Sequence, residues 1–261
     1  MIKAAIHPSL DLSGRVVLVT GASSGLGRRF AQIAAAQGAR VVAAARRTDQ
    51  LQELQREVEG RGGTLLPVRL DVADEASVVA GYDAAENAFG AVDTVIANAG
   101  VNVSGSALRL SVADFDQMSD VNIRGVFLTA REGARRMVAA GSTERKHGRI
   151  TIVSSITAHH VTAGTAVYSA TKAAVAQLGR AMAKEWAHKG ISVNVLCPGY
   201  IETDMNQHIW DQQGGKELLA GFTRRRVMDA SALDSMMVYL CSDSAEQTTG
   251  SVITIDDGQT L

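Results

Sequence analysis

Apolar runs of strand length recur along this chain and alternate with stretches that have a helical pattern of apolar positions. The runs are too continuously apolar for strands with one exposed face, which indicates burial on both faces, as in a parallel sheet. They predict seven strands, at residues 15–20, 39–45, 64–71, 92–98, 149–155, 191–196 and 251–256. The stretches between them predict helices at residues 25–37, 49–60, 74–89, 112–140, 165–188 and 229–241. This βα alternation predicts an α/β fold, in which a doubly wound, seven-stranded parallel sheet is flanked by helices.

The same pattern continues through the chain without a linker, a low-complexity tract or a repeat of domain size. We therefore expect residues 1–261 to form a single domain, with residues 1–9 as a flexible tail. The segment 198–228 has the least regular pattern and follows a predicted strand. Open α/β sheets bind ligands at the carboxyl ends of their strands, so this segment is predicted to be a substrate loop region.

Composition and charge narrow the class of protein. Hydrophobic residues make up 46% and charged residues 20% of the chain, and the net charge is −1. Such a balance gives no electrostatic reason to expect nucleic acid or a membrane surface as a partner. No apolar run approaches the roughly 20 residues that span a bilayer, and the first residues lack a signal-peptide pattern. Because Cys197 and Cys241 lie in apolar surroundings without a Cys-x-x-Cys pair, we expect buried free thiols and a cytoplasmic protein.

A glycine-rich turn follows the first predicted strand, in the sequence TGASSGLG at residues 20–27. Gly21, Gly25 and Gly27 permit a tight bend and let backbone N–H groups approach a pyrophosphate at the start of the next helix. The spacing differs from the common Gly-x-Gly-x-x-Gly fingerprint, and no Lys-Ser/Thr follows as in a Walker loop. Its place in a βαβ unit predicts a Rossmann-type dinucleotide site, and the alternative is a turn without a ligand.

The end of the second predicted strand indicates which dinucleotide is bound. Enzymes that select NAD place an acidic residue there to bind the ribose 2′-hydroxyl, whereas this chain has Ala45 followed by Arg46 and Arg47. A guanidinium binds a 2′-phosphate through charge-assisted bonds, which favours NADP(H), with Arg46 as the main contact. NAD(H), and two arginines that only solvate a loop, stay open as alternatives. Asp71, which ends the third strand, is placed to accept from an adenine amino group.

A tyrosine and a lysine stand four residues apart in AVYSATKAAVAQL, residues 166–178. On a helix this spacing puts Tyr168 and Lys172 on one face. A neighbouring cation lowers the pKa of a phenol from about 10, so Tyr168 would exchange a proton with a carbonyl oxygen or an alcohol. The alternative is a surface pair without a chemical role.

Taken together, the motifs of this chain resemble those of the short-chain dehydrogenase/reductase family over its whole length. The matching stretches are TGASSGLG at 20–27, LDVAD at 70–74, NAG at 98–100, DVNIRG around Asn122, IVSS at 152–155, Tyr168-x-x-x-Lys172 and PGYIET at 198–203. The resemblance implies an NAD(P)-dependent oxidoreductase that transfers a hydride between NADP(H) and a carbonyl or secondary alcohol. A ketone or 3-oxoacyl-type reductase is favoured. The alternatives are an NAD-linked alcohol, sugar or steroid dehydrogenase and, from another class, a non-catalytic cofactor-binding sensor.

The resemblance also implies the site residues. The catalytic set is Asn122, Ser155, Tyr168 and Lys172; we choose Ser155 because Ser154 would face the other side of its strand. Ser155 is expected to bind the substrate oxygen, and Asn122 to hold a water linked to Lys172. The residues expected to bind the cofactor are Gly21, Ser23, Ser24, Gly25, Leu26, Gly27, Arg46, Arg47, Asp71, Val72, Asn98, Ala99, Gly100, Tyr168, Lys172, Pro198, Gly199, Ile201 and Thr203. No metal site is predicted, because the histidines have no second ligand at suitable spacing.

Two departures from the family pattern stand out. Ser24 occupies a position where many NADP-dependent relatives have a basic residue, and Asp257 one where glycine is commonest. The arginines at 224–226 fit either an acidic or phosphorylated partner or a solvated loop.

Two helices also bear on assembly. Those at 112–140 and 165–188 have apolar or small residues on more than one face, and relatives commonly use them to assemble. We therefore expect a homo-oligomer, a dimer or a tetramer, acting on a small-molecule carbonyl or alcohol.

Overall fold

The fold is an α/β sandwich built on one parallel sheet. The structure, a computed structural model, describes residues 9–202, 210 and 212–261. In this part of the chain the sheet has seven parallel strands in the order β3-β2-β1-β4-β5-β6-β7, as the apolar runs predict. The strands are β1 (Val16–Thr20), β2 (Arg40–Ala45), β3 (Thr64–Arg69), β4 (Thr94–Ala97), β5 (Gly148–Val153), β6 (Ile191–Pro198) and β7 (Val252–Ile255).

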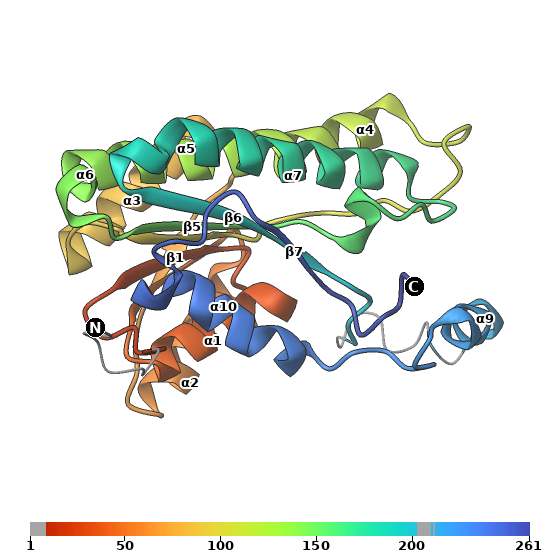
Figure 1. The fold of residues 1–261 in the computed structure, drawn as a ribbon, viewed down its shortest axis with the longest axis horizontal. Helices are drawn as coiled ribbons and strands as arrows, with labels where there is room; N and C mark the ends of the chain where they lie inside the picture. Colours follow the sequence, from red (N-terminus) through yellow and green to blue (C-terminus); the bar gives the residue numbers. More distant parts are fainter. Residues whose placement is uncertain (1–8, 203–209, 211) are drawn as a thin grey trace, which may run out of the picture.

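Helices cover both faces of the sheet (Figure 1). They are α1 (Gly25–Ala36), α2 (Thr48–Glu59), α3 (Glu75–Phe89), α4 (Val112–Ser119), α5 (Gly125–Ala139), α6 (Ser142–Arg145), α7 (Ala166–Trp186), α9 (Gln213–Gly221) and α10 (Asp234–Cys241). Figure 1 shows α3, α4, α5 and α7 on one face and α1, α2 and α10 on the other. No helix among the described residues is both long and apolar enough to cross a lipid bilayer.

Side chains that alternate between the two faces of the sheet build a hydrophobic core on each face. In β1, Val16 and Leu18 belong to the core under α3, α5 and α7, whereas Val17 and Val19 belong to the core under α1, α2 and α10. Because successive strand side chains point to opposite faces, a continuously apolar strand must be buried on both sides. Cys197 and Cys241 are buried free thiols within these cores, as the sequence predicts.

The winding of the sheet reverses between β1 and β4. β1 pairs with β2 on one side and with β4 on the other, so the chain turns from one half of the sheet to the other at this point. In open α/β sheets the crevice at such a reversal, outside the carboxyl ends of the strands, is the place where ligands bind.

Three predicted segments differ from the structure. The helix predicted at 112–140 is divided into α4 and α5 by a π-helical segment at Asp120–Arg124. The helix predicted from residue 229 begins with a 3₁₀ turn, because the Asp229 side chain accepts a hydrogen bond from the Ser231 N–H at 2.7 Å. The segment 198–228 contains α9, which its polar, glycine-containing sequence does not reveal.

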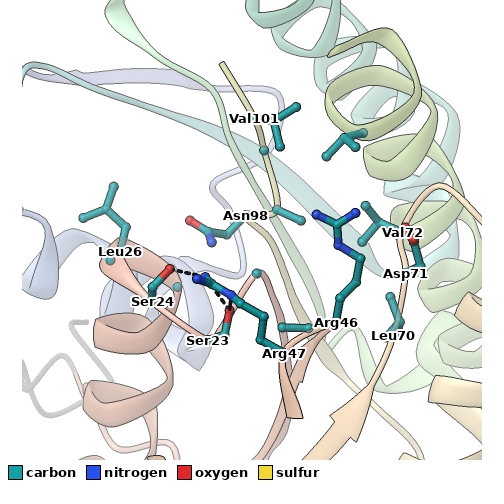
Figure 2. A pocket seen from close by; sticks show the side chains of 17 residues that line it. Ser23, Ser24, Leu26, Arg46, Arg47, Leu70, Asp71, Val72, Asn98 and Val101 are labelled. Carbon is teal, nitrogen blue, oxygen red and sulfur yellow. Dashed lines mark hydrogen bonds between the residues drawn. The ribbon is translucent and has the colours of Figure 1, made fainter. Parts of the chain in front are cut away.

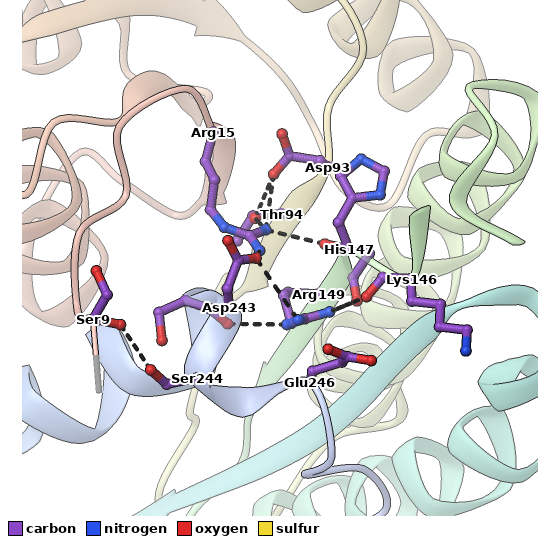
Figure 3. Close-up of polar contacts among 12 residues, drawn as sticks. Ser9, Arg15, Asp93, Thr94, Lys146, His147, Arg149, Asp243, Ser244 and Glu246 are labelled. Atoms are coloured by element: carbon purple, nitrogen blue, oxygen red, sulfur yellow. Dashed lines mark hydrogen bonds and ion pairs between the residues drawn. The ribbon is translucent and has the colours of Figure 1, made fainter. Parts of the chain in front are cut away.

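A polar network closes the opposite, amino edge of the sheet (Figure 3). Arg15 donates from Nη1 to Asp93 Oδ1 at 3.2 Å and to Thr94 Oγ1 at 2.9 Å, and from Nη2 to Asp243. Arg149, which is 2% exposed, donates to the backbone carbonyls of residues 146, 148 and 242 at 3.0–3.1 Å. These bonds tie the starts of β1, β4 and β5 to the segment after α10.

Candidate active site and cofactor pocket

A cavity of about 360 Å³ lies at the carboxyl ends of the strands where the winding reverses (Figure 2). The residues of this cavity that the sequence predicts are Gly21, Ser23, Ser24, Gly25, Leu26, Gly27, Arg46, Arg47, Asp71, Val72, Asn98, Ala99 and Gly100. Those that it misses are Ala45, Leu70, Val101 and Val121. The missed residues are apolar and lie next to predicted ones, so their adjacency to the motifs was the signal that could have found them.

The glycine loop fits an anionic ligand. Gly21 and Gly25 have φ values of +68° and +54°, a region that favours glycine. A Cβ on Gly27 would overlap the Gly21 carbonyl, so this glycine lets helix α1 approach the loop. Ser24, the N-cap of α1, makes no side-chain cap bond. The first N–H groups of α1 are therefore free of a side-chain cap and can bind phosphate oxygens.

Two arginines line the other side of the cavity. Arg47 donates from Nη2 to Ser23 Oγ at 2.9 Å and to Ser24 Oγ at 2.7 Å. This guanidinium therefore reaches Ser24, the position where many NADP-dependent relatives have a basic residue. Figure 2 shows Arg46 extended into the cavity beside Asp71 and Val72. Within the described residues Arg46 has no hydrogen bond or ion pair, so its charge is available to a ligand.

Asn98 fixes the floor of the cavity. Its Nδ2 donates to the Thr20 carbonyl at 3.0 Å, and the N–H groups of Asn98 and Ala99 both donate to Thr20 Oγ1 at 3.1 Å. These bonds hold the ends of β1 and β4 together. Thr20 is a supporting residue that the motif comparison does not single out.

Tyr168 and Lys172 lie one turn apart on α7, and neither lines the cavity. Lys172 is 4% exposed, and its Nζ donates to the Val153 carbonyl at 2.9 Å and lies 5.6 Å from the centre of the Tyr168 ring. A Cβ on Gly100 would lie 3.4 Å from both Lys172 Nζ and Asn122 Oδ1. The lysine and the asparagine therefore converge on Gly100, which also lines the cavity.

The pKa values of this pair differ from expectation. Burial raises the pKa of Tyr168, and its hydrogen bond with Ser155 acts in the opposite direction without offsetting burial. The predicted lowering of the Tyr168 pKa is therefore wrong. Desolvation of the phenolate outweighs the other influences on this pKa. Burial lowers the pKa of Lys172 itself from 10.5 to about 8.

The two serines after β5 have different partners. Ser154 is 4% exposed, and its Oγ donates to the backbone carbonyl of Lys172 at 2.8 Å. Ser155 Oγ accepts from the Thr157 N–H at 3.2 Å and hydrogen-bonds Tyr168. The structure thus brings Ser155, and not Ser154, to the phenol.

Asn122 lies in the π-helical segment and is fully buried. Its Oδ1 accepts from the Val101 N–H at 2.8 Å, and its Nδ2 donates to the Val101 carbonyl at 2.9 Å and to Thr171 Oγ1 at 3.0 Å. The amide therefore ties the segment after β4 to α7. Its two N–H donors are already used, and Thr171, the neighbour of Lys172, is a partner that the sequence comparison missed.

The site residues predicted after the sixth strand lie in a separate segment, at the end of β6. Pro198 ends β6, the Gly199 N–H donates to the Ile255 carbonyl at 2.9 Å, and Ile201 forms an isolated bridge with Met228. None of these residues lines the 360 Å³ cavity. The predicted contact Thr203 lies outside the described residues.

The carboxyl-terminal segment supports that region in a way that no motif signals. Asp257, at the position where glycine is commonest in the family pattern, has a φ of +54°, a left-handed conformation that favours glycine. Its carboxylate binds Arg224 Nη1 at 3.1 Å and Arg226 Nε at 2.6 Å. Two of the three neighbouring arginines are therefore paired within the chain.

Comparison with known proteins identifies the family. The chain matches the family model for short chain dehydrogenase over residues 15–214. It is 34% identical over 258 residues to oxidoreductase UcpA of Salmonella typhimurium, with 96% of each chain covered. It is 31% identical to the 3-oxoacyl-[acyl-carrier-protein] reductase FabG of Escherichia coli, which covers 95% of this chain and 98% of that protein.

A solved structure agrees with this assignment. A gluconate 5-dehydrogenase from Burkholderia cenocepacia, in complex with NADP and tartrate, superimposes with a TM-score of 0.90 at 31% identity. The match covers 97% of this chain and 98% of that protein. This chain belongs to the short-chain dehydrogenase/reductase family and is an NAD(P)-dependent oxidoreductase.

Proposed function

We propose that the protein transfers a hydride between NADP(H) and a carbonyl group or secondary alcohol, with a ketone or 3-oxoacyl-type compound as the favoured substrate. One observation carries this proposal: Ser155, Tyr168 and Lys172 lie together next to Gly100, which lines the same cavity as Arg46 and Arg47. The relatives named as a 3-oxoacyl reductase and as a gluconate dehydrogenase support carbonyl–alcohol chemistry.

The roles follow from the side chains. NADPH, when bound, supplies the hydride. Ser155 and Tyr168 hydrogen-bond the carbonyl oxygen, and Tyr168 donates its proton as negative charge develops there. Lys172 places a positive charge 5.6 Å from the centre of the phenol ring, which favours the tyrosinate that remains although burial opposes it. Asn122 fixes the segment after β4 against α7, which keeps Gly100 at the meeting point of the cavity and the catalytic groups.

The preference for NADP(H) rests on the two arginines. The glycine loop and the N-terminus of α1 would hold the pyrophosphate, and Asp71, which lines the same cavity, would bind the adenine. Arg46 and Arg47 would bind the 2′-phosphate. Ala45, at the end of β2, offers no carboxylate to the 2′-hydroxyl of NAD(H). Three solved relatives contain NADP, which supports the same preference.

The proposal is tested by measuring kcat/KM for NADPH and NADH with a panel of ketones. We expect NADPH to be preferred, and Arg46→Ala to lower kcat/KM for NADPH about tenfold to a hundredfold while NADH changes little, because one charge-assisted bond is lost. Arg56→Ala on the exposed side of α2 serves as the control. A wild-type preference for NADH would overturn the cofactor assignment, and no reduction of any ketone would overturn the proposed reaction.

We also propose that the protein assembles as a homo-oligomer through α4, α5 and α7. Val112 is 76% exposed, Phe115 51% and Phe127 37%, and these side chains extend along α4 and α5. An apolar surface of this kind is typical of an interface. A monomeric mass in light scattering at micromolar concentration would contradict this assembly.

A further inference from the structure

Tyr200, two residues after the end of β6, is held in place by hydrogen bonds on both polar groups of its backbone. Its N–H donates to Gln259 Oε1 at 2.6 Å, and its carbonyl accepts from Gln259 Nε2 at 3.0 Å. Gln259 is only 7% exposed, so these bonds are shielded from water. The Tyr200 carbonyl also accepts from the Met228 N–H at 3.1 Å. The backbone is therefore held on both of its polar groups.

Aromatic neighbours fix the ring as well. The Phe222 ring stacks on Tyr200 with centres 5.5 Å apart and an angle of 28°, and Trp210 meets it edge-on at 5.9 Å. A phenylalanine at position 200 would keep both ring contacts and all of the backbone bonds. The hydroxyl is the one thing that tyrosine adds, so a role for Tyr200 beyond packing must lie in that group.

The hydroxyl lies at the amino-terminal end of α7. Tyr200 Oη approaches Thr162 Oγ1 at 3.4 Å, a long contact that uses one side of the phenol at most. The carbonyl of Thr162 in turn accepts from Oγ1 of Thr165, the N-cap of α7, at 2.7 Å. Tyr168 is in the first turn of that helix, and Tyr200 contributes to the raised pKa of Tyr168. A half-buried tyrosine whose hydroxyl has hydrogen-bonding capacity left over thus lies at the start of α7, the helix whose first turn carries Tyr168.

We propose that the Tyr200 hydroxyl binds a substrate hydroxyl on the carbon next to the reacting carbonyl, so that the site favours α-hydroxy ketones over ketones with an alkyl group there. This inference rests on the proposed function. A rigid hydroxyl with one weak contact loses hydration when a substrate covers it. A substrate hydroxyl replaces the hydrogen bond to water that Tyr200 has lost, whereas an alkyl group leaves the Tyr200 hydroxyl without that bond. The site therefore binds the hydroxylated substrate more strongly than the alkylated one.

The test uses two ketones of similar shape, 2-hydroxycyclohexanone and 2-methylcyclohexanone, with NADPH. We expect the wild-type protein to have the higher kcat/KM for the hydroxylated ketone, and Tyr200→Phe to lower the ratio of the two values about tenfold, as expected for loss of one uncharged hydrogen bond. Tyr239→Phe is the matched control, because it removes a hydroxyl whose partner is Thr248, outside the candidate site. The control variant is expected to keep the wild-type ratio.

A ratio that Tyr200→Phe leaves unchanged would overturn the inference while leaving the proposed function intact. If the wild-type protein reduces neither of these two ketones, the inference is read from binding instead, and the wider ketone panel decides the proposed function. Calorimetry with the NADP⁺ complex gives Kd for each ketone. Tighter binding of the hydroxylated ketone that Tyr200→Phe abolishes supports the role of the hydroxyl, and equal Kd values in the wild-type protein overturn it.

Discussion

The two edges of the sheet both bury positive charge, but they compensate it differently. At the amino edge, Arg149 donates to three backbone carbonyls and lies 4.0 Å from Asp243, while Arg15 pairs with Asp93 and Asp243 (Figure 3). At the carboxyl edge, Lys172 has one backbone carbonyl as its hydrogen-bond acceptor, and no described carboxylate forms an ion pair with it. The same sheet therefore holds a cation with several hydrogen-bond acceptors at one end and a cation with one acceptor at the other, and burial lowers the pKa of both.

This difference suggests that one edge contributes mainly to the stability of the fold and the other mainly to catalysis. Removing one member of a buried network of polar and charged groups leaves the other members unpaired, which destabilises the fold. A buried cation without a carboxylate has a depressed pKa and destabilises the fold, which is a common property of functional sites. The amino edge is thus expected to respond to substitution in the free energy of unfolding, and the carboxyl edge in catalysis.

The largest effect is expected from Tyr168→Phe. The substitution removes the proton donor and keeps the ring, so kcat/KM for ketone reduction should fall about a thousandfold, within the range for loss of a general acid. NADPH affinity and the thermal midpoint should stay near the wild-type values. Steady-state kinetics, cofactor titration and thermal unfolding check the three parts, and turnover close to wild type would show that another group donates the proton.

The next largest effect is expected from Arg149→Met at the amino edge. The variant leaves three backbone carbonyls, two of them in buried bonds, without their guanidinium donor, so the free energy of unfolding should fall by about 3 kcal/mol. The Kd for NADPH should not change, because Arg149 does not line the cofactor cavity. Urea unfolding and cofactor titration measure the two quantities. A loss of cofactor affinity with unchanged stability would reverse the contrast between the edges.

The sequence could predict the contacts that are local along the chain, but not those between distant residues. The glycine loop and the Tyr168–Lys172 pair are local patterns, and short spacing alone puts their groups together. The bond of Arg15 to Asp93 joins residues 78 apart, and that of Tyr200 to Gln259 joins residues 59 apart. No local pattern specifies such pairs.

Two further features of the site depend on the whole fold rather than on a motif. The π-helical segment at Asn122 forms where that side chain bonds Val101 and Thr171, and the helical pattern of the sequence conceals it. The direction of the Tyr168 pKa shift depends on burial, which the sheet and its surrounding helices create together.

The smallest effect, and the one of opposite sign, is expected from Lys172→Met. Burial lowers the pKa of this lysine from 10.5 to about 8, a shift that corresponds to roughly 3 kcal/mol of destabilisation. Loss of the hydrogen bond to the Val153 carbonyl offsets about 1 kcal/mol of the gain. The variant should therefore unfold with about 2 kcal/mol more free energy at pH 7, although it loses the cation that supports Tyr168.

The pH dependence of that gain identifies its cause. Between pH 8 and 10.5 the unfolded chain binds the Lys172 proton and the folded protein does not, so wild-type stability rises with pH over this interval. The advantage of Lys172→Met should accordingly be complete below about pH 8 and decline as the pH approaches 10.5. Lys184→Met, at an exposed position of the same helix, should give no such gain. Urea unfolding of the cofactor-free proteins at pH 7, 9 and 10 measures it, and a gain that did not change with pH would mean that Lys172 is not held with a depressed pKa.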